Sequence, residues 1–299
     1  MVARLLYRDG LMLVIDKPAG LAVHRGPKGG ESLEDHFGAL KFGLPRAPAL
    51  AHRLDHDTSG CLVLGRHRKA LASLGRLFKN GAVGKTYWAV VDGAPEADEG
   101  RIDLPLGRRD ASRGWWMKHD PNGQPASTTW KVMGRAQIPV TSPWRGEVAE
   151  RSEAGGGDDS SAASRFTASP HPGSFAADPP PQSKSDISDF DHLLVPNSGK
   201  PEFGWEGKTF TWLALEPLTG RTHQLRVHCA AQGWPITGDT IYGNAPRTGG
   251  PGLQLHAREV VVPLYKNRDP IRVSAPAPLH MHERLQACGW AGEVFTLVE

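Results

Sequence analysis

The run HRLDHDTSG occupies residues 52–60 and leads directly into the apolar stretch Cys61-Leu62-Val63-Leu64. A short apolar run bounded by turn residues is typical of a buried strand. The polar run before it therefore predicts a loop that presents the carboxylate of Asp55 at the end of a strand. The same pattern also fits an ordinary turn in which Asp55 or Asp57 only caps backbone groups.

Three small residues end this loop, and each can restrict its conformation. The hydroxyls of Thr58 and Ser59 can hydrogen-bond local backbone groups. Gly60 can adopt backbone angles that residues with a Cβ avoid. We therefore expect the loop to be rigid.

The sequence on either side of this loop predicts an α+β domain. Strands interleaved with few helices favour a central mixed, mostly antiparallel sheet flanked by helices and loops. The expected elements are a hairpin over 4–17 that turns at Asp9-Gly10, a helix over 67–80, strands over 61–64, 86–91 and 209–215, and a helix over 223–232.

A central segment differs in composition from the rest of the chain. Residues 139–198 contain Gly155-Gly156-Gly157 and Pro179-Pro180-Pro181, with almost no apolar periodicity. Such a segment buries too little surface to offset the entropy lost on ordering. We therefore expect a disordered, low-complexity insertion at 139–198 within one domain formed by 1–138 and 199–299.

Composition and charge exclude several classes of protein. The formal net charge is only +3, but the window 51–90 holds seven Lys and Arg against two acids, which suits a polyanionic substrate. Three widely spaced cysteines argue against a disulfide framework and against a zinc site. The chain shows neither a signal-peptide pattern nor an apolar run long enough to span a membrane, so a cytoplasmic location is expected. Nucleotide-binding, metalloprotease and serine-hydrolase motifs are also missing, which favours chemistry without a cofactor or metal.

Two further segments carry candidate site residues. Lys85-Thr86-Tyr87 opens a predicted strand in which Tyr87 and Trp88 face opposite sides of the sheet, so one can face a substrate while the other packs in the core. Residues 218–228, LTGRTHQLRVH, place a Gly turn before a helix, whose first backbone N–H groups suit an anion. Arg221 could pair with a carboxylate there. Taken singly, Tyr87 is better explained as a core or edge tyrosine, and Arg221 as an ordinary surface arginine.

In this order the three segments resemble the RluA-type RNA pseudouridine synthases. The opening run LVIDKPAGLAVH at 13–24 and the later runs GWPITGD at 233–239, Tyr242-Gly243 and Leu255-His256-Ala257 also resemble that family. The resemblance covers residues 5–138 and 205–280. It implies the pseudouridine synthase fold, without an S4-type RNA-binding domain before it because the matching hairpin starts at Leu5.

The resemblance also implies a reaction and roles for particular residues. The N1–C1′ bond of a uridine in tRNA or large-subunit rRNA is broken, and the uracil is rejoined through C5 after the nucleotide is flipped out. Asp55 is the essential carboxylate, either as C1′ nucleophile or as proton acceptor. Arg221 pairs with Asp55, and Tyr87 stacks on the base and assists loss of the C5 proton. Arg53 fills the gap left by the flipped nucleotide.

The remaining expectations concern the pocket and the partners. His52 is expected to be structural, and Leu225 fits a plain helix-core role as well as a pocket role. The expected substrate-binding residues are Arg53, Leu54, Lys85, Thr222, His223 and Leu225. RNA is the expected partner, with a monomeric enzyme and no obligate protein partner. Two alternatives stay open: a non-catalytic RNA-binding protein on the same fold, and a nucleosidase that releases free uracil.

Overall fold

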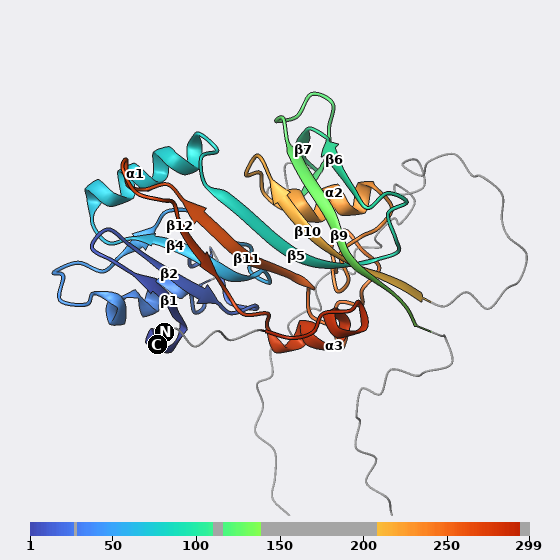
Figure 1. Cartoon of the computed structure of the whole chain (residues 1–299), viewed down its shortest axis with the longest axis horizontal. Coiled ribbons are helices and arrows are strands. Elements are labelled where there is room, and N and C mark those ends of the chain that lie inside the picture. The colour runs from blue at the N-terminus through green and yellow to red at the C-terminus, as the bar shows by residue number, and fades with distance from the viewer. Residues whose placement is uncertain (27–28, 110–115, 139–207, 294–299) are drawn as a thin grey trace, which may run out of the picture. The chain divides into compact units, whose positions relative to one another are not determined.

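The computed structural model describes residues 1–26, 29–109, 116–138 and 208–293. The predicted insertion at 139–198 lies outside these residues. Within them, the chain forms one compact unit built on a single large sheet with helices on its faces (Figure 1).

The large sheet has the strand order β1-β2-β4-β11-β5-β10-β9-β6, with β12 paired to β11 and β3 paired to β4. Its members are β1 (Leu5–Arg8), β2 (Met12–Lys17), β3 (Ala49–Leu50), β4 (Ser59–Gly65), β5 (Gly84–Asp92), β6 (Glu99–Asp103), β9 (Ser127–Ile138), β10 (Lys208–Pro217), β11 (Leu255–Val262) and β12 (Ile271–Ser274). A separate two-stranded ribbon pairs β7 (Leu106–Arg108) with β8 (Met117–His119).

Among the described strands, β4 and β11 pair in parallel through His256–Ser59 and Ala257–Gly60, whereas the other pairings are antiparallel. The expected mixed, mostly antiparallel sheet is therefore confirmed. The helices are α1 (Arg68–Lys79), α2 (Gln224–Ala231) and α3 (Leu279–Ala287), with 3-10 turns at Val2–Arg4 and Leu33–Leu40.

The elements expected from the sequence are present with small shifts at their ends. The hairpin turns at Asp9, whose carboxylate accepts the backbone N–H groups of Leu11 and Met12. β4 starts at Ser59, two residues earlier than the apolar run, because Ser59 and Gly60 at the end of the loop already pair with β11. Gly81, with φ of +67°, follows the end of α1 as expected.

Packing against the sheet brings the C-terminal end of α1 close to the N-terminal end of α2. α1 packs on β4 through Leu74, which joins a buried cluster with Val63 and Val83. α2 packs through Leu225 and Cys229 into a different cluster beneath β5 and β10. The residues after α1 and those before α2 consequently border one cleft. No helix among the described residues has the length and apolar character needed to cross a membrane.

Tyr87 and Trp88 face opposite sides of the sheet, as their alternation on β5 predicts. Tyr87 packs against the two clusters that border the cleft. Trp88 packs on the other side, with its ring centroid 4.8 Å from that of Trp212. The tyrosine is thus the member of the pair that reaches the cleft.

Candidate active site

The cleft has a volume of about 610 Å³ and is lined by every residue that the sequence marks as catalytic or substrate-binding. One wall is the loop before β4, and the opposite wall is the segment between β10 and α2. These residues are Arg53, Leu54, Asp55, Lys85, Tyr87, Arg221, Thr222, His223 and Leu225.

The Asp55 loop is held by a buried lysine that the sequence does not single out. The Lys17 side chain has no exposed surface, and its Nζ donates to the carbonyl oxygens of Pro18, His56 and Thr58 at 2.8–2.9 Å. Burial lowers the Lys17 pKa from 10.5 to about 8, although nearby Asp57, Asp55 and Asp16 oppose the shift. Because two of these carbonyls lie one and three residues after Asp55, the ammonium fixes the loop backbone.

The end of the loop is fixed by close contact with β11. Gly60 has φ of +105°, and a Cβ there would lie 2.3 Å from the carbonyl oxygen of Ala257, so only glycine fits. The hydroxyl of Ser59 bonds Nδ1 of His256 at 2.9 Å, not local backbone as expected. The Thr58 backbone N–H closes the turn onto the Asp55 carbonyl, while its buried hydroxyl has no hydrogen-bond partner in the described chain.

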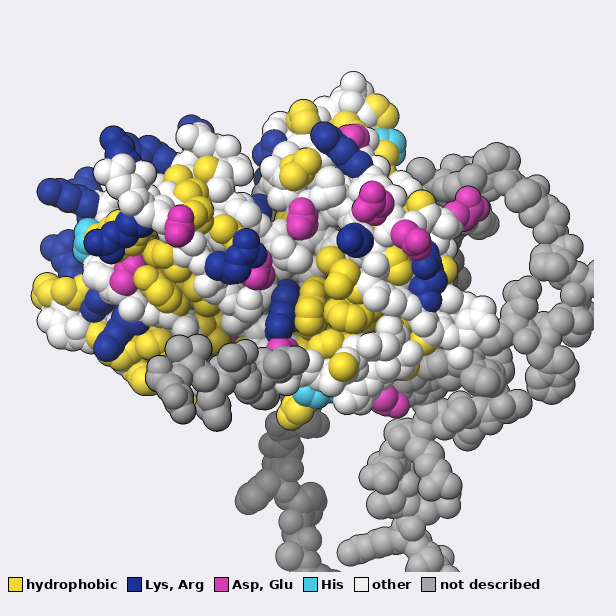
Figure 2. Space-filling view, viewed as in Figure 1, with side chains coloured by type: hydrophobic (Ala, Val, Ile, Leu, Met, Phe, Trp, Pro, Cys, Tyr) yellow, Lys and Arg dark blue, Asp and Glu magenta, His cyan; other side chains and the backbone are white. Residues whose placement is uncertain are grey.

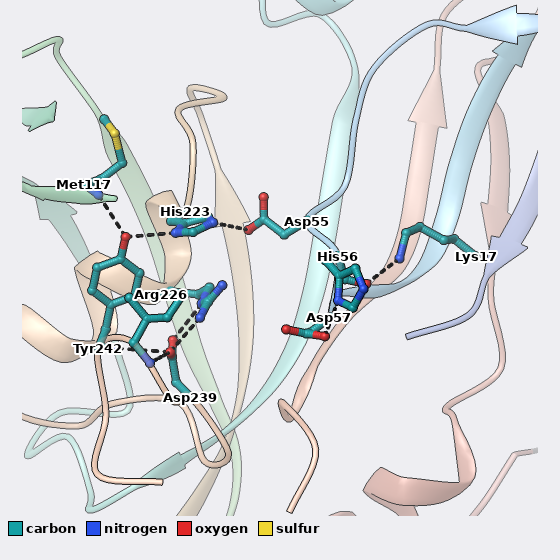
Figure 3. A network of polar contacts seen from close by, with 10 residues as sticks. Lys17, Asp55, His56, Asp57, Met117, His223, Arg226, Asp239 and Tyr242 are labelled. Carbon is teal, nitrogen blue, oxygen red and sulfur yellow. Dashed lines mark hydrogen bonds and ion pairs between the residues drawn. The ribbon is translucent and has the colours of Figure 1, made fainter. Parts of the chain in front are cut away.

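The opposite wall contacts Asp55 through His223 (Figure 3). Nε2 of His223 lies 3.9 Å from Oδ2 of Asp55, and the two side chains are 7% and 20% exposed. Nδ1 of His223 lies 2.8 Å from the hydroxyl of Tyr242, which accepts the backbone N–H of Met117 at 2.9 Å. A proton on Nε2 faces the carboxylate favourably, so Tyr242 donates to Nδ1 and sets the tautomer.

His223 also occupies an unusual backbone conformation. Its φ of +51° lies in the left-handed region, where a non-glycine residue costs roughly 1–3 kcal/mol. This residue is the N-terminal cap position of α2. Burial and the nearby Arg226 lower the His223 pKa, while Asp55 opposes the shift. The imidazole is therefore neutral at neutral pH, with its Nε2 turned toward the carboxylate.

Beneath His223 lies a buried ion pair that organises the same wall. Arg226 donates to both oxygens of Asp239 at 2.7 and 2.6 Å, and the two side chains are 5% and 0% exposed. Asp239 also accepts the backbone N–H groups of Ile241 and Tyr242, which places the Tyr242 ring beside the Arg226 guanidinium. Although burial opposes it, Asp239, with a smaller contribution from Asp55, raises the Arg226 pKa. The site thus keeps a permanent positive charge near Asp55.

The expected pairing of Arg221 with Asp55 is not made. The Arg221 side chain is exposed, and its Nε donates to the carbonyl oxygen of Pro125 at 3.1 Å. In the described chain, the carboxylate of Asp55 faces His223, and the buried arginine whose charge acts on Asp55 is Arg226. The reason is local: Arg221 precedes the left-handed turn at His223 and lies at the rim, whereas Arg226 lies within α2.

The remaining predicted residues divide between the rim and the floor of the cleft. Arg53 is exposed at the rim, and Thr222 is partly exposed. Leu54 and Leu225 are 6% and 7% exposed and belong to core clusters, so both line the cleft and pack the core. Lys85 lies partly buried, and burial lowers its pKa.

Two further aromatic residues of the cleft have contrasting environments. Burial, the nearby carboxylate of Asp55 and the thiol of Cys61 raise the pKa of Tyr87, so its hydroxyl keeps its proton. Nε2 of His52 accepts the backbone N–H of Val63, and the ring stacks on Phe78. Burial and the charge of Lys85 lower the His52 pKa to about 3, so this neutral ring supports the loop, as expected.

The sequence gives no role to Lys17, Arg226, Asp239 or Tyr242, although each lies in a stretch that carries the family resemblance. The contacts of Lys17 with His56, of Arg226 with Asp239 and of Tyr242 with Met117 span 39, 13 and 125 residues, so spacing alone gives no signal for them. In the described ranges, no group of three or more His, Cys, Asp and Glu side chains could hold a metal ion.

Comparison with known proteins shows the family of the chain. Residues 11–231 match the family described as RNA pseudouridylate synthase. An uncharacterized RNA pseudouridine synthase of Zymomonas mobilis is 32% identical over 277 residues, which span 92% of this chain and 94% of the relative. The ribosomal large subunit pseudouridine synthase C of Vibrio cholerae is 25% identical over 94% of this chain and 68% of its own length.

Solved structures show the same fold. Human RNA pseudouridylate synthase domain containing 1 superposes with a TM-score of 0.60 at 22% identity, covering 98% of this chain and 90% of the human one. The fold and the matched region define an isomerase that acts on RNA. The chain belongs to the RNA pseudouridine synthases of the RluA type.

Proposed function

We propose that this enzyme isomerises a specific uridine in tRNA or large-subunit rRNA, with Asp55 as the essential carboxylate. The observation that carries the proposal is the position of Asp55, on a backbone-fixed loop and within 3.9 Å of a tyrosine-oriented imidazole. The relatives named for the ribosomal large subunit support rRNA as one candidate substrate.

Asp55 would act where positive charge develops during the reaction. Breaking the N1–C1′ bond leaves the sugar with oxocarbenium character, which an adjacent anion stabilises. Rejoining through C5 releases the C5 proton, while N1 takes up a proton, so no redox partner or water is consumed. We assign His223 to positioning: its Nε2–H keeps Asp55 in the orientation that faces the sugar.

The cleft residues fit a nucleotide that has left its stack. C1′ and C5 cannot be reached or rotated inside stacked RNA, so the base must be flipped. Tyr87 lines the cleft, where it would stack on the uracil, and Leu54 and Leu225 supply an apolar floor. Arg53, which is exposed at the rim, would fill the place that the flipped nucleotide leaves in the stack. Arg221 and Thr222 would contact the phosphates on either side of the target nucleotide.

The proposal is tested by the chemistry of the product. Unmodified tRNA and large-subunit rRNA transcripts are incubated with the enzyme, and pseudouridine is detected by chemical derivatisation followed by mass analysis. We expect pseudouridine without release of uracil, and no product with Asp55→Ala. Free uracil would identify a nucleosidase instead. Full activity of Asp55→Ala would refute the role of Asp55.

A further inference from the structure

A basic region of the surface, centred on α1, lies next to the catalytic cleft. Residues 36–91 contain nine Lys and Arg but only two acids, Asp55 and Asp57, both in the catalytic loop. Helix α1 carries Arg68, Lys69, Arg76 and Lys79 and no acidic residue. Figure 2 shows Lys and Arg side chains gathered at the edge of the molecule where α1 lies in Figure 1.

The positive residues of α1 share one face of the helix. At 100° per residue, Arg76 and Lys79 lie about 80° and 20° from Arg68, and Lys69 about 100° from it. Leu74 and Leu77, which pack in the core, lie on the other side. The rise of 1.5 Å per residue spreads this basic face over about 16 Å, roughly five nucleotides of a stacked strand.

The two ends of α1 border two different hollows. Phe78 and Lys79 at its C-terminal end line the catalytic cleft. Arg68 and Lys69 at its other end line a second hollow of about 520 Å³, together with Arg46 and the backbone-bound Arg66. The basic face therefore connects the cleft to a second basic concavity.

These charges have no carboxylate partner within the described ranges. Arg46, Arg68, Lys69, Arg76 and Lys79 are exposed, and none makes an ion pair there. The exposed residues between them on α1 are the small Ala72 and Gly75. A helix that lies on a membrane would instead present large apolar side chains beside its basic residues. The composition of this face suits a hydrated polyanion.

We propose that the RNA strand leaving the catalytic cleft runs along α1, with its phosphates against Lys79, Arg76 and Arg68, and reaches the second hollow at Lys69 and Arg46. This inference rests on the proposed function, since it takes RNA as the substrate. It assigns α1 to binding the RNA that flanks the target uridine, and gives it no part in the chemical step.

The test compares two double variants that each lose two positive charges. Arg68→Gln with Arg76→Gln alters α1, and Lys131→Gln with Lys208→Gln alters β9 and β10. Binding of fluorescein-labelled unmodified tRNA and rRNA-hairpin transcripts is measured over a range of salt concentrations, and the single-turnover rate of pseudouridine formation is measured at saturating enzyme.

We expect the α1 variant to raise Kd about tenfold or more. Each lost phosphate contact should reduce the slope of log K against log salt by about 0.7, so the two substitutions together should reduce it by about 1.4. Its rate at saturation should stay within about threefold of the wild type, and the control should bind normally. Equal Kd values for the two variants would overturn the inference while leaving pseudouridine formation, and so the proposed function, intact. It would also be overturned if the α1 variant lost binding to phosphatidylserine vesicles but kept its RNA affinity.

Discussion

The two walls of the catalytic cleft are held by different means. The Asp55 wall is fixed through its backbone, by the Lys17 ammonium on the loop carbonyls and by the close fit of Gly60 on β11. The α2 wall is fixed through side chains, by the Arg226–Asp239 ion pair and by the Tyr242–His223 hydrogen bond. The carboxylate is therefore carried by a rigid loop, and its immediate electrostatic environment is supplied from the other wall.

The largest expected effect concerns the ion pair of the α2 wall. Asp239→Asn leaves the Arg226 charge buried without its counter-charge, which should lower the free energy of unfolding by about 3–5 kcal/mol. Urea denaturation measures this change. The matched control is Asp103→Asn, which breaks the exposed pair with Arg101 and should leave the urea midpoint almost unchanged. Equal losses in the two variants would show that the buried pair does not organise this wall.

The Asp55 wall should make the stability of the protein depend on pH, through Lys17. Its folded pKa of about 8 lies below the ordinary 10.5, so between these values the unfolded chain binds more protons than the folded protein. The free energy of unfolding should therefore rise with pH across this window, by up to about 3 kcal/mol relative to Lys17→Met. Urea denaturation of both proteins from pH 7 to pH 10 checks this. Parallel curves would mean that the Lys17 pKa is not lowered.

The hydrogen bond between Tyr242 and His223 should affect rate more than stability. Tyr242→Phe removes the donor that sets the His223 tautomer, and His223→Phe removes the N–H that faces Asp55. By analogy with residues that orient a reactive group, we expect losses of about 10- to 100-fold in the single-turnover rate. His223→Gln keeps an N–H and should lose less. A larger loss with glutamine than with phenylalanine would contradict the positioning role.

The smallest effect is expected at Arg221. Its exposed guanidinium contacts a backbone carbonyl, so Arg221→Gln should change stability by less than about 1 kcal/mol. The single-turnover rate should fall by no more than about fivefold. A loss as large as that of an Asp55 variant would show that Arg221 reaches the carboxylate once RNA is bound, as the sequence resemblance implies.

The contrast between the walls also explains what the sequence predicts and what it misses. The Asp55 loop can be recognised from a few consecutive residues, because Gly60 and the buried strand follow it directly, although Lys17 and β11, which hold it, lie far away in the chain. The α2 wall depends on the αL turn at His223 and on pairings such as Tyr242 with Met117, 125 residues away. No local pattern fixes which arginine faces inward, so the sequence names Arg221 where the fold buries Arg226.

The most direct test of the central claim compares two aspartates of one loop. Asp55 faces His223 in the cleft, whereas Asp57 is exposed and contacts His56. Pseudouridine formation is measured under single-turnover conditions with Asp55→Asn and with Asp57→Asn, after equal RNA affinity has been established. We expect a loss of at least about 10³-fold for Asp55→Asn and a rate close to wild type for Asp57→Asn. Comparable activity in the two variants would contradict the assignment of Asp55 as the essential carboxylate.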